Sequence, residues 1–265
     1  MNPAVAAALA EDIGSGDITT LLTIPADAVA TGTVTARQPL TLAGAELLAD
    51  IFPCAVELLR RSGDVLHSGD VIAIVRGPAR DLLTSERTAL NFLQRLSGIA
   101  TLTARYVEAV AGTRCRVLDT RKTTPGLRQL EKMAVAAGGG TNYRFGLYDA
   151  VLIKNNHIAA AGGVTATLER TRGAKVPVEI EVRTREELRE ALNCGATHLL
   201  LDNLTPAAAK EWIDEIAGRA RVELSGGITL DNVRAYAETG ADFVSCGALT
   251  HSAPAVDINF RVELG

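Results

Sequence analysis

Residues 178–203, VEIEVRTREELREALNCGATHLLLDN, contain the unit that decides the predicted fold. Residues 178–182 and 198–203 are short runs rich in Val, Ile and Leu, as expected of strands that are buried on both faces. The residues between these runs have a helical pattern. A strand, a helix and a second strand joined by short links predict a parallel strand pair.

Helix boundaries in this region carry recognisable signals. Thr184 followed by Glu187 predicts a capping box at the start of one helix. Thr205 before Pro206 places a proline at the first position of the next helix. Gly195 lies where a left-handed cap is expected to end the first of these helices.

The same alternation of strand and helix extends from Arg114 onward. The six predicted strands are residues 116–120, 150–154, 178–182, 198–203, 221–225 and 243–247. Such an order predicts a parallel sheet that is either open or closed into a barrel.

The N-terminal part of the chain has a different pattern. Between residues 24 and 77, short β-like runs such as residues 29–36 are interrupted by glycine and proline. Gly-Asp-Val occurs at Gly63 and again at Gly69, which predicts a repeated turn followed by a strand. We therefore expect a small antiparallel sandwich, followed by a long helix over residues 83–111.

Composition excludes several classes of protein. Of the 265 residues, 47% are hydrophobic and 22% are charged, which is typical of a globular chain with a full core. The net charge of −4 argues against general nucleic-acid binding. The four cysteines form no C-x-x-C pair, which argues against a metal or redox motif and favours a cytoplasmic location.

Two features argue against export and membrane insertion. The apolar residues 4–10 are followed at once by Glu11 and Asp12 and lack a basic region before them, so they predict a helix and not a signal peptide. In addition, no apolar run approaches the length of about 20 residues that a membrane span requires.

Nearly every predicted strand ends in polar or small residues. These residues are Thr120, Arg121, Lys122, Lys154, Glu181, Asp202, Ser225, Gly226, Gly227, Ser245, Cys246 and Gly247. Active sites of α/β barrels lie at the C-terminal ends of the strands. We therefore expect these groups to converge on one site.

Positive charge predicts an anionic ligand for that site. Residues 114–154 contain eight basic and three acidic side chains in a chain of negative net charge. Arg121 and Arg144 suit carboxylates, because a guanidinium can donate two parallel hydrogen bonds, whereas a lysine acts as a point charge for phosphate. Arg128 and Lys132 fit a solvated helix face equally well.

The glycine loops after the last two strands are candidate phosphate sites. Small residues such as Ser225, Gly226 and Gly227 let backbone N–H groups approach an anion closely, and barrels often bind phosphate at this place. His251 lies near the second loop and is a candidate donor to the same phosphate. The alternatives are a simple turn and a surface histidine.

Glu181 and Asp202 are candidate partners for Mg²⁺ or for ribose hydroxyls, because they are carboxylates in a basic region. The alternative is that they are structural counter-ions of the basic cluster.

Taken together, these segments resemble the quinolinate phosphoribosyltransferase (decarboxylating) family. Residues 119–128, DTRKTTPGLR, are similar to its most specific stretch. Further similar segments are residues 11–12, 16–17, 87–101, 131–132, 138–140, 142–144, 152–157 and 201–203, together with the two glycine loops. The resemblance covers almost the whole chain. One position departs, because the family has a histidine where this chain has Tyr143.

The resemblance implies an α/β fold with an N-terminal sandwich domain and an incomplete parallel α/β barrel. The implied domains are residues 1–112, residues 113–250 and a C-terminal segment of residues 251–265 that returns to the first domain. It also implies a homodimer, or a multiple of dimers, in which Arg87 reaches the neighbouring subunit's site.

The implied reaction transfers phosphoribose from phosphoribosyl pyrophosphate to quinolinate, releases carbon dioxide and makes nicotinate mononucleotide for NAD synthesis. We expect Arg87, Arg121, Arg144 and Lys154, with Tyr143 beside them, to bind the quinolinate carboxylates. The expected catalytic residues are Lys122, Lys154, Glu181 and Asp202. Mg²⁺ is the expected cofactor, held by Glu181 and Asp202 indirectly, through magnesium pyrophosphate.

Three other functions are open to test. Tyr143 favours a paralogue that acts on another anionic heterocycle, whereas the contexts of Asn142 and Lys154 argue against it. Lys154 at a strand end would suit a Schiff-base aldolase. Residues 63–77 resemble a biotinyl or lipoyl carrier hairpin, but the tip lacks the lysine that such a domain modifies.

Overall fold

The computed structural model describes residues 1–264, and the chain forms two compact units. The first unit comprises residues 1–104, 124–139 and 252–264, and the second comprises residues 105–123 and 140–251. This division differs from the predicted boundaries, because residues 105–112 belong to the second unit and residues 124–139 to the first. Within the first unit, Arg95 donates to Glu131 at 2.9 Å, which links residues 124–139 to the long helix.

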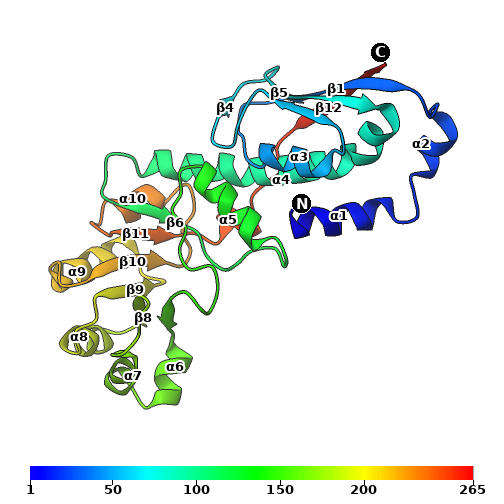
Figure 1. Cartoon of the computed structure of the whole chain (residues 1–265). Helices are drawn as coiled ribbons and strands as arrows, with labels where there is room; N and C mark the ends of the chain where they lie inside the picture. Colours follow the sequence, from blue (N-terminus) through cyan, green and yellow to red (C-terminus); the bar gives the residue numbers. More distant parts are fainter. Residues whose placement is uncertain (265) are drawn as a thin grey trace. The chain divides into compact units, whose positions relative to one another are not determined.

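An antiparallel sheet with the strand order β12-β1-β5-β3 forms the centre of the first unit (Figure 1). Its strands are β1 (Val29–Ala36), β3 (Ala55–Leu58), β5 (Val71–Pro78) and β12 (Ile258–Leu264). β12 comes from the end of the described chain and pairs with β1 from Ala30 to Ala36. The antiparallel pairing agrees with the sandwich predicted for this part of the chain.

The repeated Gly-Asp-Val sequence forms two equivalent turns, as predicted. Gly63 and Gly69 have the same left-handed φ of 97°. The carboxylates of Asp64 and Asp70 each accept a hydrogen bond from the backbone N–H three residues earlier, at 2.9 and 2.8 Å. One turn leads into β4 (Val65–Leu66), which pairs with β2 (Leu40–Thr41), and the other leads into β5.

The long helix α4 (Ala79–Ala109) lies along one face of this sheet (Figure 1). The prediction placed it over residues 83–111, so it begins four residues earlier and ends two residues earlier. Leu93 and Leu96 are fully buried, as the apolar pattern predicted. Shorter helices of the first unit are α1 (Pro3–Ile13), α2 (Ile18–Thr23), α3 (Leu48–Ile51) and α5 (Arg128–Ala137), with a 3-10 turn at Ala45–Leu47.

Within the described chain, the second unit has a parallel sheet with the order β6-β11-β10-β9-β8-β7. Each predicted strand is present. The strands are β6 (Arg116–Leu118), β7 (Val151–Ile153), β8 (Val178–Val182), β9 (His198–Asp202), β10 (Arg221–Ser225) and β11 (Phe243–Ser245). The intervening helices are α6 (Asn155–Ala161), α7 (Val164–Thr171), α8 (Arg185–Asn193), α9 (Pro206–Ile216), α10 (Val233–Ala237) and α11 (Ala248–His251).

Most of the helix-boundary predictions are confirmed. Thr184 is the N-cap of α8 and accepts from the Glu187 N–H at 3.1 Å. The predicted capping box is wrong in its second half, because the Glu187 carboxylate accepts from the N–H of Arg183, one residue before the cap. Gly195 adopts the expected left-handed φ of 82°, and Thr205 caps α9.

Candidate active site

A cavity of about 590 Å³ opens in the second unit at the carboxyl ends of the parallel strands. Its lining includes eleven predicted site residues: Thr120, Arg121, Lys122, Tyr143, Arg144, Lys154, Asp202, Ser225, Gly226, Gly227 and Ser245. The strand register explains this convergence, since Asp202 at the end of β9 lies beside Ser225 at the end of β10. The remaining lining residues are Asp119, Leu152, Leu200, Asn203 and Glu223.

Glu181 pairs with Lys154, one of the two lysines that line the cavity. Its carboxylate is 4% exposed and lies 3.6 Å from the Lys154 Nζ and 3.2 Å from the Arg183 Nε. A buried carboxylate needs such partners, because ionisation away from water is costly. Lys154 therefore lines the cavity, whereas its partner Glu181 does not.

Asp119 organises the segment that carries Tyr143 and Arg144. Its side chain is buried and accepts from the Tyr143 N–H at 2.9 Å. Its own N–H donates to Thr141 at 3.2 Å, so strand β6 and this segment are fixed to each other. Asp119 belongs to the motif identified in the sequence, but its role as a structural acceptor was not predicted.

Two hydrogen bonds hold the backbone of Lys122, one at its N–H and one at its carbonyl. Its N–H donates to Thr120 at 3.0 Å, and its carbonyl accepts from the Thr250 hydroxyl at 2.7 Å. A Cβ at Gly247 would lie 2.8 Å from the Lys122 Cδ and 3.1 Å from the His251 ring. Gly247 and His251 are therefore neighbours of Lys122, although neither lines the cavity.

Cys246 makes a different contribution from its neighbours in the loop. Burial raises the pKa of its thiol to about 12, so the side chain is neutral. Its N–H donates to the Leu118 carbonyl at 3.2 Å. The structure thus places Cys246 between β11 and β6 as a packing residue, away from the cavity lining.

The first glycine loop is packed tightly against Asn203. Gly226 and Gly227 both have left-handed backbones, with φ of 93° and 62°. A Cβ at Gly226 would lie 2.2 Å from the Asn203 Oδ1, so no larger residue fits there. Asn203 also donates to Asp202 at 2.7 Å, which orients that carboxylate beside the loop.

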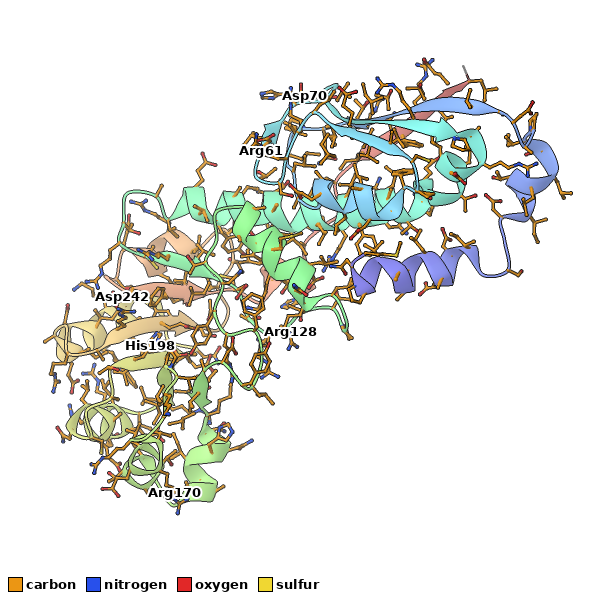
Figure 2. All side chains as sticks on the ribbon, in the orientation of Figure 1. Arg61, Asp70, Arg128, Arg170, His198 and Asp242 are labelled. Carbon is orange, nitrogen blue, oxygen red and sulfur yellow. The ribbon has the colours of Figure 1, made fainter. Side chains whose placement is uncertain are left out.

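Tyr143 lies beside a group of three side chains that were not predicted as site residues, Glu179, His198 and Glu223. Glu179 is fully buried, Glu223 is 2% exposed, and His198 projects from β9 (Figure 2). The His198 Nε2 lies 3.4 Å from Glu179, and its ring meets the edge of Tyr143 at 6.3 Å. Burial and the neighbouring Glu179 raise the pKa of Glu223, and the same causes raise the pKa of Tyr143.

Candidate metal ligands in the described residues fall in this same group. Glu179, His198 and Glu223 offer ligand atoms that all lie within 4.8 Å of one another. By contrast, both oxygens of Glu181 already face cations of the protein, and Asp202 alone of the two predicted carboxylates lines the cavity. The expected role of Glu181 and Asp202 toward magnesium stays a prediction.

Arg87 lies on α4, in the first unit. It lines a separate cavity of about 380 Å³ together with Asp12, Asp17 and Thr84. Asp17 caps α2 by accepting from the Thr20 N–H at 2.9 Å. Arg87 is thus the one predicted ligand that the structure places in the first unit.

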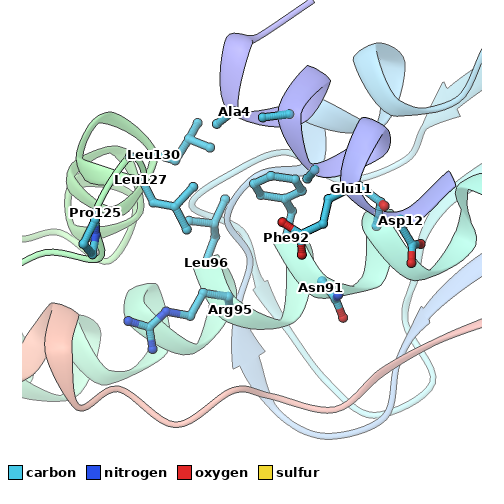
Figure 3. Close-up of a pocket in the computed structure, with 14 residues that line it drawn as sticks. Ala4, Glu11, Asp12, Asn91, Phe92, Arg95, Leu96, Pro125, Leu127 and Leu130 are labelled. Carbon is cyan, nitrogen blue, oxygen red and sulfur yellow. The ribbon is translucent and has the colours of Figure 1, made fainter. Parts of the chain in front are cut away.

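Another cavity of the first unit, of about 430 Å³, lies between α1, α4 and residues 125–130 (Figure 3). Much of its wall is apolar and includes Phe92 and Leu96. Its charged residues are Glu11, Asp12 and Arg95, and Arg95 donates to Glu131. This cavity therefore suits a strongly anionic substrate less well than the cavity of the second unit, which has four cationic side chains.

Comparison with known proteins assigns the chain to a family. Residues 17–97 match the quinolinate phosphoribosyl transferase N-terminal domain, and residues 99–261 match the C-terminal domain. The chain belongs to the quinolinate phosphoribosyltransferase family. Its site residues fall in the C-terminal match, except Arg87, which falls in the N-terminal one.

Curated relatives of this family member span nearly its whole length. A probable nicotinate-nucleotide pyrophosphorylase [carboxylating] of Bacillus subtilis (strain 168) is 43% identical over an alignment of 262 residues that covers 96% of this chain and 90% of the relative. The nicotinate-nucleotide pyrophosphorylase [carboxylating] of Mycobacterium leprae (strain TN) is 43% identical over an alignment of 269 positions that covers 95% of this chain and 93% of the relative.

Solved structures of the quinolinate phosphoribosyltransferase family share the fold. NadC from Streptococcus pyogenes matches with a TM-score of 0.94 and 39% identity over 99% of this chain and 96% of the other. The nicotinate-nucleotide pyrophosphorylase of Ehrlichia chaffeensis matches with a TM-score of 0.94 and 34% identity over 99% of both chains. These matches confirm the predicted α/β fold class.

None of the helices in the described part of the chain combines the length and the apolar character that a membrane span requires.

Proposed function

We propose that this chain is a pentosyltransferase that transfers phosphoribose from phosphoribosyl pyrophosphate to the ring nitrogen of quinolinate. The products are nicotinate mononucleotide, pyrophosphate and carbon dioxide. The observation that carries the proposal is the cavity of the second unit, where four cationic side chains meet a glycine loop in a member of this family.

The cations divide between the two substrates by their chemistry. Arg121 and Arg144 bind the quinolinate carboxylates through paired hydrogen bonds, which a planar guanidinium supplies. Lys122 and Lys154 face the pyrophosphate of the second substrate. The loop of Ser225, Gly226 and Gly227 binds the 5′-phosphate, because its small residues let backbone N–H groups approach the anion.

Chemistry begins when the bond between ribose C1 and the pyrophosphate oxygen breaks. The electron pair leaves with pyrophosphate, where Lys122 and Lys154 stabilise the new charge. Positive charge develops on the ribose, and the Asp202 carboxylate, oriented by Asn203, stabilises it more in the transition state than in the ground state. The ring nitrogen then forms a bond to C1.

Decarboxylation follows from that alkylation. The cationic ring nitrogen accepts the electron density left at C2 when the adjacent carboxylate departs as carbon dioxide. A proton from solvent then replaces the lost group at C2. Glu181 takes part indirectly, since it holds Lys154 toward the cavity.

Magnesium enters as a complex with the pyrophosphate of the substrate. The ion would neutralise charge on the leaving group, and Asp202, which lines the cavity, would contact the magnesium complex. We further propose a cytoplasmic homodimer in which Arg87 completes the neighbouring subunit's quinolinate site.

An assay with quinolinate and with nicotinate tests the function. With phosphoribosyl pyrophosphate and Mg²⁺, quinolinate should yield nicotinate mononucleotide and one equivalent of carbon dioxide. Nicotinate lacks the second carboxylate, so cations of the site remain unpaired and kcat/KM should fall at least about 100-fold. Equal kcat/KM values would contradict the assignment of Arg121 and Arg144.

Two of the alternative functions are not favoured. A paralogue for another heterocycle is disfavoured by curated relatives that carry the pyrophosphorylase name at 43% identity over most of the chain. A Schiff-base aldolase is disfavoured because the two domain models that match the chain are both those of quinolinate phosphoribosyl transferase.

A further inference from the structure

Glu179, His198 and Glu223 come from three neighbouring strands, β8, β9 and β10, and form a cluster on one side of the parallel sheet. In the register of β9 with β10, His198 pairs with Arg221, so Glu223, two residues further along, points to the same side as His198. The register of β8 with β9 places Glu179 beside His198 in the same way. The sheet therefore fixes one side chain from each strand at one place, as a rigid ligand site requires.

The possible ligand atoms of this cluster lie close together. One carboxylate oxygen of Glu179, one of Glu223 and one ring nitrogen of His198 all lie within 4.8 Å of one another. The His198 Nε2 lies 3.4 Å from the Glu179 Oε1. Ligands that bind a zinc ion at about 2.0–2.2 Å are roughly 3–4 Å apart. A small contraction of the cluster would therefore suit an ion of this size.

Burial leaves the cluster short of hydrogen-bond partners. Glu179 is fully buried, and Glu223 is 2% exposed. Among the described residues, neither carboxylate oxygen of Glu179 has a hydrogen-bond partner, and the same holds for the Glu223 Oε2 and the His198 Nε2. Buried polar atoms are rarely left in this state, because a carboxylate away from water loses its solvation without compensation. A divalent cation would bind these atoms together and balance the two carboxylate charges.

The donor set indicates which kind of cation fits. Imidazole suits zinc and related transition metals, whereas Mg²⁺ and Ca²⁺ prefer ligand sets made of oxygen alone. Histidine and glutamate together are established zinc ligands, and three protein ligands leave one position for water. Glu223 also lines the cavity of the second unit, which gives an ion a route to the cluster.

From this geometry we propose that Glu179, His198 and Glu223 form a binding site for one divalent transition-metal ion of the zinc class. The site differs from the proposed place of magnesium, which involves Asp202 and the pyrophosphate of the substrate. The ion links β8, β9 and β10 and thereby stabilises the second unit. This proposal goes beyond the proposed function, because the ion binds without either substrate.

Zinc uptake by the full chain tests the site. Protein freed of metal by dialysis against EDTA is equilibrated with Zn²⁺, and the bound metal is counted by mass spectrometry. We expect one zinc ion per chain, which an excess of Mg²⁺ does not displace. At a free Zn²⁺ concentration about 100 times the Kd, the Tm should rise by roughly 5 °C, because the ion binds the folded chain alone.

Ligand variants locate the ion. Glu179→Gln, His198→Asn and Glu223→Gln should each raise the Kd for Zn²⁺ at least about 30-fold, because each removes one of only three protein ligands. His67→Asn and Glu57→Gln are the matched controls, since they remove an exposed histidine and an exposed carboxylate of the first unit. Both controls should bind zinc as the parent does.

Stability without metal gives a second readout. Glu179→Gln removes a buried negative charge that has no partner in the metal-free chain, so its Tm under those conditions should be no lower than that of the parent. With zinc present, the parent should be the more stable of the two. Should either glutamine variant fail to fold, the zinc uptake and Tm of the parent, compared with His198→Asn, still decide the matter.

The proposal is overturned if the metal-free parent takes up no zinc or gains no thermal stability from it. Zinc binding of parental strength in all three ligand variants would place the ion elsewhere on the chain and would also contradict it. Failure of the proposed function looks different, because a chain that makes no nicotinate mononucleotide would still bind zinc at this cluster.

Discussion

At the scale of single residues, the two glycine loops of the cavity have different reasons for their glycines. Gly226 has a left-handed backbone and lies against the side chain and N–H of Asn203. Gly247 does not have a left-handed φ, but a Cβ added to it would lie against the side chains of Lys122 and His251. We therefore expect the first glycine to matter for folding and the second for the position of Lys122, the lysine proposed to bind pyrophosphate.

Gly226→Ala should destabilise the protein. Its Cβ would lie 2.2 Å from the Asn203 Oδ1 and adopt an unfavourable φ, so we expect a loss of about 2 kcal/mol or more in the free energy of unfolding. Gly195→Ala is the matched control, because Gly195 is also left-handed but has nothing within 4 Å of its added Cβ. Denaturant unfolding measures both, and equal losses would show that crowding by Asn203 is unimportant.

Gly247→Ala should impair function with little effect on stability. The new methyl group would displace the Lys122 Cδ, which is part of a flexible side chain that can move away from it. We expect the KM for phosphoribosyl pyrophosphate to rise at least about threefold while the Tm changes by less than about 1 °C. Gly173→Ala, at an open position of the same unit, should change neither quantity. An unchanged KM in Gly247→Ala would remove Lys122 from the pyrophosphate site.

At the scale of elements, local sequence signals determine most helix and strand boundaries of the second unit. Thr184 caps α8, and its hydroxyl accepts from the Glu187 N–H. Thr184→Ala should therefore cost about 1 kcal/mol and lower the Tm by about 2–4 °C, with both KM values unchanged. Thr184→Ser, which keeps the acceptor, should retain most of the stability. A full loss in Thr184→Ser would show that the methyl group matters and not the cap.

The same locality explains which parts of the fold the sequence predicts. Strand and helix periodicity, caps and turn glycines act within a few residues, and the six parallel strands and the repeated turn follow from them. Local signals do not predict that residues 124–139 belong to the first unit, because this depends on contacts such as that of Arg95 with Glu131, 36 residues apart. No local pattern encodes a pairing of that kind.

Candidate site residues also divide into those that the sequence predicts and those that only the folded structure brings together. Strand ends are visible in the sequence, so Asp202 and Ser225 could be placed at one edge of the sheet. Glu179 and Glu223 lie within strands, and only the folded chain brings them together under Tyr143. One signal was present, because Glu179 and Glu181 alternate along β8 and must therefore point to the same side of the sheet.

At the scale of the whole molecule, Arg87 differs from the other predicted ligands, because it lies in the first unit and they lie in the second. It belongs to the first unit and lines a cavity with Asp12, Asp17 and Thr84. The proposed dimer accounts for this position, because a neighbouring subunit can receive the arginine. That proposal makes a prediction about mixtures of inactive variants.

Arg87→Ala and Lys154→Ala should each be inactive alone and regain activity when mixed. In a hybrid dimer, one site receives an intact Arg87 from the Lys154→Ala subunit and has its own Lys154, so it is complete, while the other site lacks both groups. Random exchange makes half of the dimers hybrids with one complete site of two, so the mixture should approach a quarter of the parent activity. Mixing Lys122→Ala with Lys154→Ala is the control, because both groups line one cavity of a single chain and no hybrid site is complete. If labelled subunits are seen to exchange and the first mixture stays as inactive as the control, Arg87 does not act across the interface.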